Sequence, residues 1–425
     1  MRTLTLAFML TGLLSTAAWA GTDEQTGVPT AQPEKVGMSS DRLERLSSVM
    51  QGYIDDNLLA GTVTLVARKG KVVHFEAQGF RDIEANDPMG KDSIFVMMSM
   101  TKPIVSVALM MLYEEGHFLL DDPITNWIPE LGGKKVLNGV ESRVSAERPV
   151  TIRHVLTHTS GLDPNRDQLS DDERAYLRRE ATVEKTLLKR ATLPLNFQPG
   201  ERWQYGSSTD YVALLVERIS GESMDDYLRE RIFEPLGMLD THYNVPESKV
   251  DRVAAVYRPS EADKTIELAY APSYREPTTY FPGTYGLSST AADYFKFQQM
   301  VLNGGELNGV RLLSPKTVNL MITNHTGDRS IYIRGPGYGF GLGYSVLRDP
   351  GLAKEPLTPG SFSWGGAWGT IFWVDPAEEM IGIMLTQITS YRHLTVRQKL
   401  AVMATQAIIE SYSSESPPVM GYEKR

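Results

Sequence analysis

The feature that most constrains the fold is a nearly continuous apolar run, FVMMSMTKPIVSVALMMLYEEG, at residues 95–116. From Ile104 to Leu112 it is apolar on every side of a helix, which predicts a helix buried at the centre of the fold. Ser99 and Lys102 stand near its start, one helical turn apart and on the same face. Because an unpaired lysine in a core is costly, the run also predicts a functional site at this end.

A hydroxyl and an amine at the start of a buried helix suit nucleophilic catalysis. The helix N-terminus supplies free N–H groups and a positive dipole, which favour an alkoxide or an oxyanion. An amine in a dry site can accept the proton of a serine. The spacing alone is a weak signal, because about one Ser-x-x-Lys is expected by chance in a chain of this length. The alternative is an ordinary surface helix start, and the apolar context favours the catalytic interpretation.

A second candidate segment is FQPGERWQYGSSTDYVALLVERISG, in which a Pro-Gly turn leads to Tyr205-Gly206-Ser207. Ser207, Ser208 or Thr209 is of a type that caps a helix, so Tyr205 is predicted on a loop just before one. A phenol beside an ammonium can relay a proton. For a single tyrosine, a structural role is the simpler alternative.

A third candidate segment is GSFSWGGAWGTIFWVDP, in which Gly365 and Gly366 precede a strand from Thr370 to Val374. Paired glycines at a sheet edge permit close approach of a ligand to the backbone. The N–H of Ala367 could face the serine and complete an oxyanion hole. The alternative is a bulge or a tight turn.

The two ends of the chain both predict antiparallel strands. Residues 62–68 and 72–77 alternate around Lys69-Gly70 and predict a hairpin, and two apolar strands flank Asp375-Pro376. Between them, the periodic segments are helical, including ERAYLRREATVEKTLLKRA, and a last helix is predicted over 396–411. The pattern predicts an α/β (α+β) architecture, with an antiparallel sheet built from both chain ends, flanking helices and an inserted all-helical lobe. The predicted divisions are an extended leader (21–37), an α/β lobe (38–120 with 271–415), a helical lobe (121–270) and a tail (416–425).

The N-terminus predicts export. Residues 1–20 combine Arg2, a short apolar run and Ala18-Trp19-Ala20, which is typical of a cleavable signal peptide and predicts a periplasmic or secreted protein. The apolar run is short for a membrane anchor, and no later segment predicts a span. The net charge of −9 argues against a nucleic-acid partner, and the absence of cysteine excludes disulfides and thiol nucleophiles. The sequence leaves the oligomeric state open.

In these segments the chain resembles the serine β-lactamase and penicillin-recognising superfamily, and most closely its class C-like branch that includes the family VIII carboxylesterases. The resemblance covers about residues 35–412, with family-like stretches such as IRHVLTHTSGL at 152–162 and GYGFGLGYSV at 337–346. Its principal matches are Ser99-Met100-Thr101-Lys102, Tyr205-Gly206-Ser207 and Trp364-Gly365-Gly366.

The resemblance implies roles for these residues. Ser99 would be the acylated nucleophile, Lys102 its base and Tyr205 a partner in proton transfer. The N–H groups of Ser99 and Ala367 would form the oxyanion hole, and no metal or organic cofactor is expected. The implied substrate-binding residues are Ser207, Trp364, Gly365 and Gly366. His158, which a search for a Ser–His–Asp triad would select, is interpreted as structural.

Two departures favour esters over lactams. Ser207 stands where the lactamases have asparagine, and Trp364 stands where they have the lysine that faces the lactam carboxylate. The function expected is therefore hydrolysis of small or short-acyl esters, with p-nitrophenyl acetate or butyrate preferred over nitrocefin by at least about a hundredfold. An arginine that the fold brings to this site from another segment, such as Arg334 or Arg392, could replace the missing positive charge and would weaken that expectation. The alternatives are a β-lactamase, DD-peptidase or D-aminopeptidase with the same residues, and a non-catalytic envelope binding protein.

Overall fold

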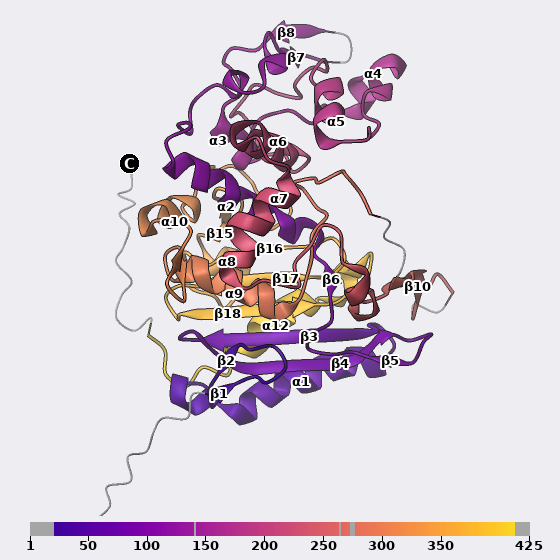
Figure 1. Cartoon of the computed structure of the whole chain (residues 1–425), viewed down its shortest axis with the longest axis vertical. Coiled ribbons are helices and arrows are strands. Elements are labelled where there is room, and N and C mark those ends of the chain that lie inside the picture. Colours follow the sequence, from indigo (N-terminus) through magenta and orange to yellow (C-terminus); the bar gives the residue numbers. More distant parts are fainter. Residues whose placement is uncertain (1–20, 140–141, 263–264, 273–276, 413–425) are drawn as a thin grey trace, which may run out of the picture.

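The computed structural model describes residues 21–139, 142–262, 265–272 and 277–412. The signal peptide predicted at 1–20 and the tail at 416–425 lie outside them. Within the described residues, one ten-stranded sheet has the order β1-β2-β4-β3-β18-β17-β16-β15-β14, and β5 pairs with β4 (Figure 1). Its strands are β1 (Gly21–Thr22), β2 (Pro29–Thr30), β3 (Gly61–Arg68), β4 (Lys71–Asp82), β5 (Asp87–Pro88), β14 (Tyr338–Phe340), β15 (Ser345–Leu347), β16 (Phe362–Gly365), β17 (Ile371–Asp375) and β18 (Met380–Leu385).

The two chain ends meet at the centre of this sheet. The β3–β4 hairpin and the β17–β18 pair are present as predicted, and β3 joins β18 in antiparallel register from Met380 opposite Arg68 to Leu385 opposite Val63. All neighbours in the sheet are antiparallel except β2 and β4, which pair in parallel through Thr30 and Val72. The predicted mainly antiparallel sheet is therefore confirmed, and the leader adds short strands to its edge.

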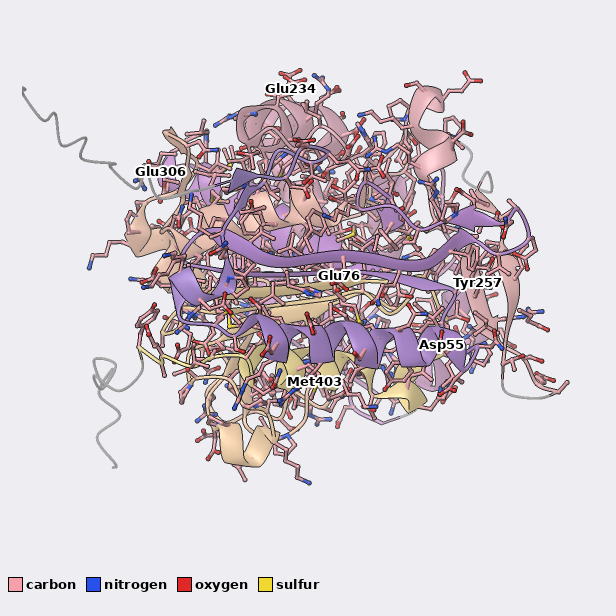
Figure 2. The ribbon with its side chains drawn as sticks, turned by 90° about the horizontal axis from the view of Figure 1, so that it is seen from below. Asp55, Glu76, Glu234, Tyr257, Glu306 and Met403 are labelled. Atoms are coloured by element: carbon pink, nitrogen blue, oxygen red, sulfur yellow. The ribbon has the colours of Figure 1, made fainter. Side chains whose placement is uncertain are left out.

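Helices cover both faces of the sheet. On one face α1 (Ser40–Asp55) packs against β4 and α12 (Val396–Thr405) packs against β18, and the two helices contact each other. Figure 2 shows them side by side, with Asp55 at the end of α1 and Met403 on α12. On the other face, α9 (Ala291–Leu302) packs against β3 and β18.

The predicted central helix is α2 (Thr101–Glu114), and every residue from Thr101 to Leu112 is buried. The helix begins later than the sequence indicates, because Met98–Met100 form a 3-10 turn. Ser99 therefore lies in this turn, ahead of the first α-helical turn. None of the helices in the described ranges combines the length and apolarity that crossing a membrane requires.

The segment predicted as the helical lobe holds mostly short helices, and in Figure 1 its elements from β7 to α6 lie above α2, whereas α8 and β10 lie lower, toward the sheet. It also contains two small hairpins, β7–β8 and β9–β10, which the sequence analysis missed. The elements are β7 (Lys135–Leu137), β8 (Arg143–Ser145), α3 (Ile152–Leu156), α4 (Asp171–Ala175), α5 (Val183–Arg190), α6 (Ser208–Ser220), α7 (Met224–Leu228), a π-helical turn (Arg229–Phe233), α8 (Glu234–Leu236), β9 (Val256–Pro259) and β10 (Ile266–Tyr270).

The remaining elements are short and connect the lobes. Two strand pairs are present: β6 (Phe95–Val96) pairs with β11 (Ser288–Ser289), and β12 (Glu306–Leu307) pairs with β13 (Val310–Arg311). The helices are α10 (Pro315–Met321) and α11 (Pro350–Ala353). Short 3-10 turns lie at Pro33–Val36, Ile124–Asn126, Pro129–Leu131, Arg166–Gln168, Glu247–Arg252 and Tyr391–Leu394.

Two helix predictions were too long. The segment from Glu173 to Ala191 breaks into α4 and α5, because Thr182 caps a new helix by accepting from the Lys185 N–H. The last helix ends at Thr405, because the backbone that follows pairs with the end of the leader: the Ile409 N–H donates to the Gly37 carbonyl over 2.9 Å.

Candidate active site

Ser99 lies on a turn that several buried contacts fix. Met98, just before it, has φ of +48°, a left-handed conformation that is strained for a residue with a side chain. The Met97 N–H donates to the Leu287 carbonyl over 2.9 Å, and the Tyr294 hydroxyl donates to the Met100 carbonyl over 3.0 Å. The half-buried Ser99 side chain is thus held at the end of β6, at the mouth of α2.

The amine of Lys102 contacts the Ser99 hydroxyl. Lys102 is 1% exposed, and its Nζ donates to Ser99 Oγ over 3.1 Å and to the Thr284 carbonyl over 2.8 Å. The same Nζ lies 4.5 Å from the centroid of the Tyr205 ring. The structure thus brings the three predicted catalytic side chains together, although Tyr205 is 103 residues from Lys102 in the sequence.

Tyr205 is held between its own loop and strand β16. The Trp364 indole N–H donates to the Tyr205 hydroxyl oxygen over 3.2 Å, and the Tyr205 N–H donates to the Tyr332 hydroxyl over 3.1 Å. Around them lies a cluster of rings with centroids 4.9 to 6.0 Å apart, made by His158, Trp203, Tyr205, Tyr332, Phe340 and Trp364. This packing fixes the direction of the phenol, since each ring restricts its neighbours.

Ser207 contacts a carboxylate that the sequence analysis did not select. Asp163 accepts from the Ser207 N–H over 2.9 Å and from the Ser207 hydroxyl over 2.6 Å. A Cβ on Gly206 would lie 2.2 Å from the Asp163 carboxylate, so only glycine fits between Tyr205 and Ser207. Burial raises the pKa of Asp163, and the Ser207 hydrogen bonds oppose that shift. Both donors of Ser207 thus bond to Asp163, and Ser207 is not among the residues that line the cavity described below.

A second unforeseen carboxylate supports Lys102. The Asp210 carboxylate accepts from the Thr284 N–H over 2.8 Å. The carbonyl of Thr284 in turn accepts from Lys102 Nζ. Asp210 is 4% exposed, and burial raises its pKa. The Thr284 peptide therefore links a buried carboxylate to the lysine and fixes where the amine points.

The predicted oxyanion site lies where the end of β16 meets the serine turn. A Cβ on Gly366 would lie 2.2 Å from Thr370 Oγ1 and 2.4 Å from the Met97 carbonyl, so this close approach requires glycine. The approach of a ligand to this glycine pair stays a prediction, and both glycines line the cavity described below. Ala367 follows and lines the same cavity as Ser99. Across the described parts of the chain, the N–H groups of Ser99 and Ala367 have no hydrogen-bond acceptor.

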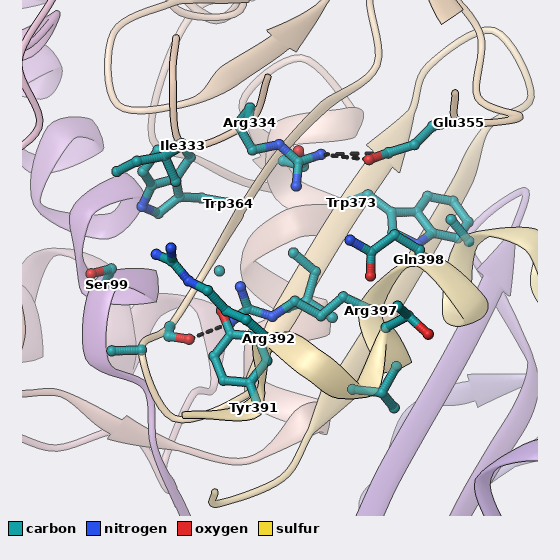
Figure 3. Close-up of a pocket in the computed structure, with 18 of the residues that line it drawn as sticks. Ser99, Ile333, Arg334, Glu355, Trp364, Trp373, Tyr391, Arg392, Arg397 and Gln398 are labelled. Carbon is teal, nitrogen blue, oxygen red and sulfur yellow. Dashed lines mark hydrogen bonds and ion pairs between the residues drawn. The ribbon is translucent and has the colours of Figure 1, made fainter. Parts of the chain in front are cut away.

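Ser99 opens into a cavity of about 350 Å³ (Figure 3). Its lining is Ser99, Tyr205, Ile333, Arg334, Glu355, Ser363, Trp364, Gly365, Gly366, Ala367, Ile371, Trp373, Tyr391, Arg392, Thr395, Val396, Arg397, Gln398 and Ala401. The sequence indicated no cation beside Trp364 except an arginine arriving from elsewhere. The structure brings Arg334, Arg392 and Arg397 to this cavity, from the loop before β14 and from the start of α12, so the cavity is cationic.

His158 does not form a triad. It is 1% exposed, its ring centroid lies 4.9 Å from that of Tyr205, and its Nδ1 has no partner within the described residues. Burial lowers the pKa of His158 well below its ordinary value, with a smaller contribution from Lys102, so the ring is neutral. As for metals, the described ranges hold no group of three or more His, Asp or Glu side chains that could bind an ion.

The fold and the serine site define the β-lactamase/transpeptidase-like class. The chain belongs to the beta-lactamase family, whose sequence model, described as "Beta-lactamase", matches residues 46–404. This confirms the resemblance stated from the sequence.

The relatives include named esterases. "Protein Rv1367c" of Mycobacterium tuberculosis is 37% identical over 78% of this chain and 87% of that protein. "Esterase EstB" of Burkholderia gladioli is 32% identical over 83% of this chain and 91% of that protein. The solved structure of "EstCE1, a hydrolase with promiscuous acyltransferase activity" superimposes with a TM-score of 0.73 at 25% identity, over 86% of this chain and 98% of that one. Family and relatives together support a serine hydrolase of the β-lactamase fold.

The residues that sequence reasoning missed are Asp163, Asp210, Thr284 and Arg397, whereas Arg334 and Arg392 had been named as arginines that the fold could bring to the site. Asp163 lies in LTHTSGLDPN, directly after the family-like stretch, and Asp210 follows the Tyr-Gly-Ser motif by three residues. Proximity to motifs could have raised these two as candidates. Nothing local marks Thr284 or Arg397, because their contacts depend on the tertiary fold.

Proposed function

We propose that this protein is a serine carboxylesterase that cleaves small or short-acyl esters through an acyl-enzyme on Ser99. The observation that carries the proposal is the 3.1 Å contact between Lys102 Nζ and Ser99 Oγ, with the Tyr205 ring beside the same amine. A nucleophile and a base within hydrogen-bond reach are what covalent acyl transfer requires. The esterase names among the relatives support the substrate class.

In the proposed reaction, Lys102 accepts the Ser99 proton as Oγ attacks the ester carbonyl. The carbonyl oxygen becomes an oxyanion, which the N–H groups of Ser99 and Ala367 stabilise. The tetrahedral intermediate collapses, the bond to the alkoxy oxygen breaks, and the alcohol leaves with a proton relayed through Tyr205. Water then attacks the acyl-enzyme with the same groups reversed, which releases the acid and restores the Ser99 hydroxyl.

The test pairs a serine-directed label with a chromogenic ester. Wild-type protein should hydrolyse p-nitrophenyl butyrate and be labelled by a fluorophosphonate at one serine, identified by peptide mass spectrometry. Ser99→Ala should lose both activities with an unchanged circular dichroism spectrum. Ser106→Ala is the matched control, because Ser106 is on α2 and its hydroxyl has no partner within the described residues. Full activity in Ser99→Ala, or labelling of another serine, would show that the nucleophile assignment is wrong.

A second candidate, a β-lactamase or a D-amino-acid peptidase with the same machinery, has one observation in its favour. The cavity carries arginines that could face a substrate carboxylate. A panel of p-nitrophenyl butyrate, nitrocefin and a D-Ala-D-Ala peptide distinguishes these activities. A non-catalytic binding protein would turn over none of the three and would not be labelled.

We also propose that the protein is exported to the periplasm or secreted. The support is the composition of residues 1–20, with the small residues Ala18 and Ala20 before the expected cleavage point. Expression of the full chain in a bacterium, followed by N-terminal sequencing of the extracytoplasmic fraction, should give a protein beginning at Gly21. Uncleaved protein in the cytoplasm would contradict the proposal.

A further inference from the structure

The wall of the cavity opposite Trp364 is built from the turn before α12 and the first turns of that helix. Figure 3 shows Arg392 extending from this turn toward Trp364 and the Ser99 side of the cavity, with Arg397 behind it. Ile371 and Val396 add apolar surface beside these cations. A substrate in this cavity thus meets positive charge and apolar side chains within reach of the nucleophile.

Three arginines line the cavity, and Glu355 is the one carboxylate among its lining residues in the described chain. Glu355 is already engaged, because it lies 3.3 Å from Arg334 Nη2 and accepts from the Tyr338 hydroxyl over 2.6 Å. The lining therefore has a formal net charge of +2, and Arg392 and Arg397 carry it.

The Arg397 guanidinium is held by neutral groups. It donates to the carbonyls of Gly366 and Thr370, the second over 2.6 Å, and lies 4.1 Å from the centroid of the Tyr391 ring. Burial lowers the pKa of Arg397 to about 10, with smaller contributions from Arg334 and Arg392 that act in the same direction. Arg397 remains protonated near neutral pH, and among the residues that the structure describes no carboxylate forms an ion pair with it.

Arg392 is different, because its head group is available. It is exposed and lines the cavity, and within the described residues it makes no hydrogen bond or ion pair. A guanidinium presents two parallel N–H donors that match a carboxylate, and such a contact is stronger when part of the site is desolvated. The repulsion among these arginines also falls when an anion enters.

We infer that the cavity selects esters that carry a free carboxylate beyond the scissile bond, with Arg392 as the partner of that carboxylate. The substrate class is half-esters of dicarboxylic acids and esters of hydroxy acids, with a short apolar connection between the two functional groups. The inference rests on the proposed esterase function of Ser99 and deepens it. Arg392 is a binding residue here, since it contacts the substrate away from the reacting atoms.

The experiment uses matched pairs that differ by one methyl group. For a carboxylate on the acyl side, mono-p-nitrophenyl adipate is compared with methyl p-nitrophenyl adipate. For a carboxylate on the leaving group, 3-acetoxybenzoate is compared with methyl 3-acetoxybenzoate. Phenol release gives kcat/KM for each, divided by its spontaneous hydrolysis rate. In at least one pair the anionic ester should be favoured by about tenfold or more, a difference of about 1.4 kcal/mol.

The variant Arg392→Gln should reduce that ratio to about one, Arg392→Lys should retain part of it, and added salt should lower it in the wild type. Arg311→Gln removes one positive charge from an exposed ion pair with Glu306 and should leave the ratio unchanged. A wild-type ratio of one or less in both pairs, or an unchanged ratio in Arg392→Gln, would overturn the inference while neutral esters are still hydrolysed. Loss of all ester hydrolysis together with no labelling of Ser99 would instead overturn the proposed function.

Discussion

The indole N–H of Trp364 donates to the hydroxyl oxygen of Tyr205 over 3.2 Å. This position has a lysine in the β-lactamases that the sequence resembles, so the chain replaces a cation with a neutral donor aimed at the phenol. In the proposed reaction, a donor to the phenolic oxygen stabilises negative charge there during proton transfer, and the indole itself adds no charge to the site. Trp364 is thus a positioning residue for Tyr205 as well as a wall of the cavity.

Trp364→Phe should lower kcat for p-nitrophenyl butyrate by about ten- to a hundredfold, because a hydrogen bond to a charged group contributes roughly 1.5 to 3 kcal/mol. The ring stays in place, so KM should change little. Steady-state kinetics across a pH series measures both constants. Trp127→Phe, in a ring pair with Phe118 at 6.0 Å, is the control and should keep wild-type kcat. An unchanged kcat in Trp364→Phe would show that the hydrogen bond from the indole N–H does not contribute to catalysis.

Lys102→Ala and Tyr205→Phe should each lower kcat by orders of magnitude, and the double variant should lose less than the product of the two losses. The reason is that the amine and the phenol share one proton-transfer step, and residues that act as a unit are not additive. Stopped-flow measurement of p-nitrophenol release gives the four rate constants of the cycle. Strictly multiplicative losses would mean that the two groups act independently.

Asp163→Asn should lower kcat by roughly tenfold, because the neutral amide holds the two Ser207 donors more weakly than the carboxylate does. The Tyr205-Gly206-Ser207 turn then becomes less ordered, whereas the Ser99–Lys102 contact is unaffected. Fluorophosphonate labelling should therefore still occur at Ser99, more slowly, with an unchanged melting temperature to within a few degrees. The exposed Asp167→Asn serves as control. Equal effects of the two variants would show that Asp163 does not position the turn.

The sequence predicted the parts of this fold that depend on local pattern. The β3–β4 hairpin follows from β-branched, alternating segments around Lys69-Gly70, and the burial of α2 follows from an apolar run with no polar face. Family motifs, in turn, predict that Ser99, Lys102 and Tyr205 share one site. These are signals that a short stretch of sequence carries by itself.

The residues that escaped prediction depend on contacts between distant segments. Asp163 and Ser207 meet across 44 positions, and Lys102 reaches the carbonyl of Thr284 across 182. Arg397, on α12, reaches the carbonyl of Gly366 across 31 positions. No periodicity or composition marks such a residue, so the charge of the cavity is a property of the tertiary structure.

Acidification between pH 6.5 and about 4 should destabilise the fold, and His154 gives one cause. Its Nδ1 accepts from the Thr151 N–H over 3.1 Å in the cap of α3, and burial lowers its pKa to about 4. Below pH 6.5 the His154 side chain binds a proton in the unfolded chain but stays neutral in the folded state. The free energy of unfolding is therefore unaffected by this group above pH 6.5 and decreases as the pH falls toward 4. At pH 5.0 the loss from this group is roughly 2 kcal/mol.

Urea unfolding at pH 7.5 and pH 5.0 measures this loss. His154→Asn removes the titrating group and should reduce the difference between the two pH values by roughly that amount. The exposed His117→Asn is the control, and it should leave the pH difference as in the wild type. An identical pH difference in His154→Asn and the wild type would contradict the assignment.

Esters should remain better substrates than β-lactams, although the arginines of the cavity reduce the kcat/KM ratio that the sequence alone predicts. Ser207 is committed to Asp163 and Trp364 carries no charge, so two groups on which lactam recognition depends in the resembled enzymes are missing. Arg392, however, supplies a partner for the nitrocefin carboxylate, which a neutral cavity would leave desolvated and unpaired. We therefore expect p-nitrophenyl butyrate to exceed nitrocefin in kcat/KM by at least about tenfold, instead of a hundredfold. Arg392→Gln should widen the ratio by about another tenfold, through loss of nitrocefin hydrolysis. The test measures kcat/KM for both substrates in the same buffer, with one purified sample each of the wild type and Arg392→Gln. Equal kcat/KM values in the wild type would place the protein on the lactam-hydrolysing side of its family.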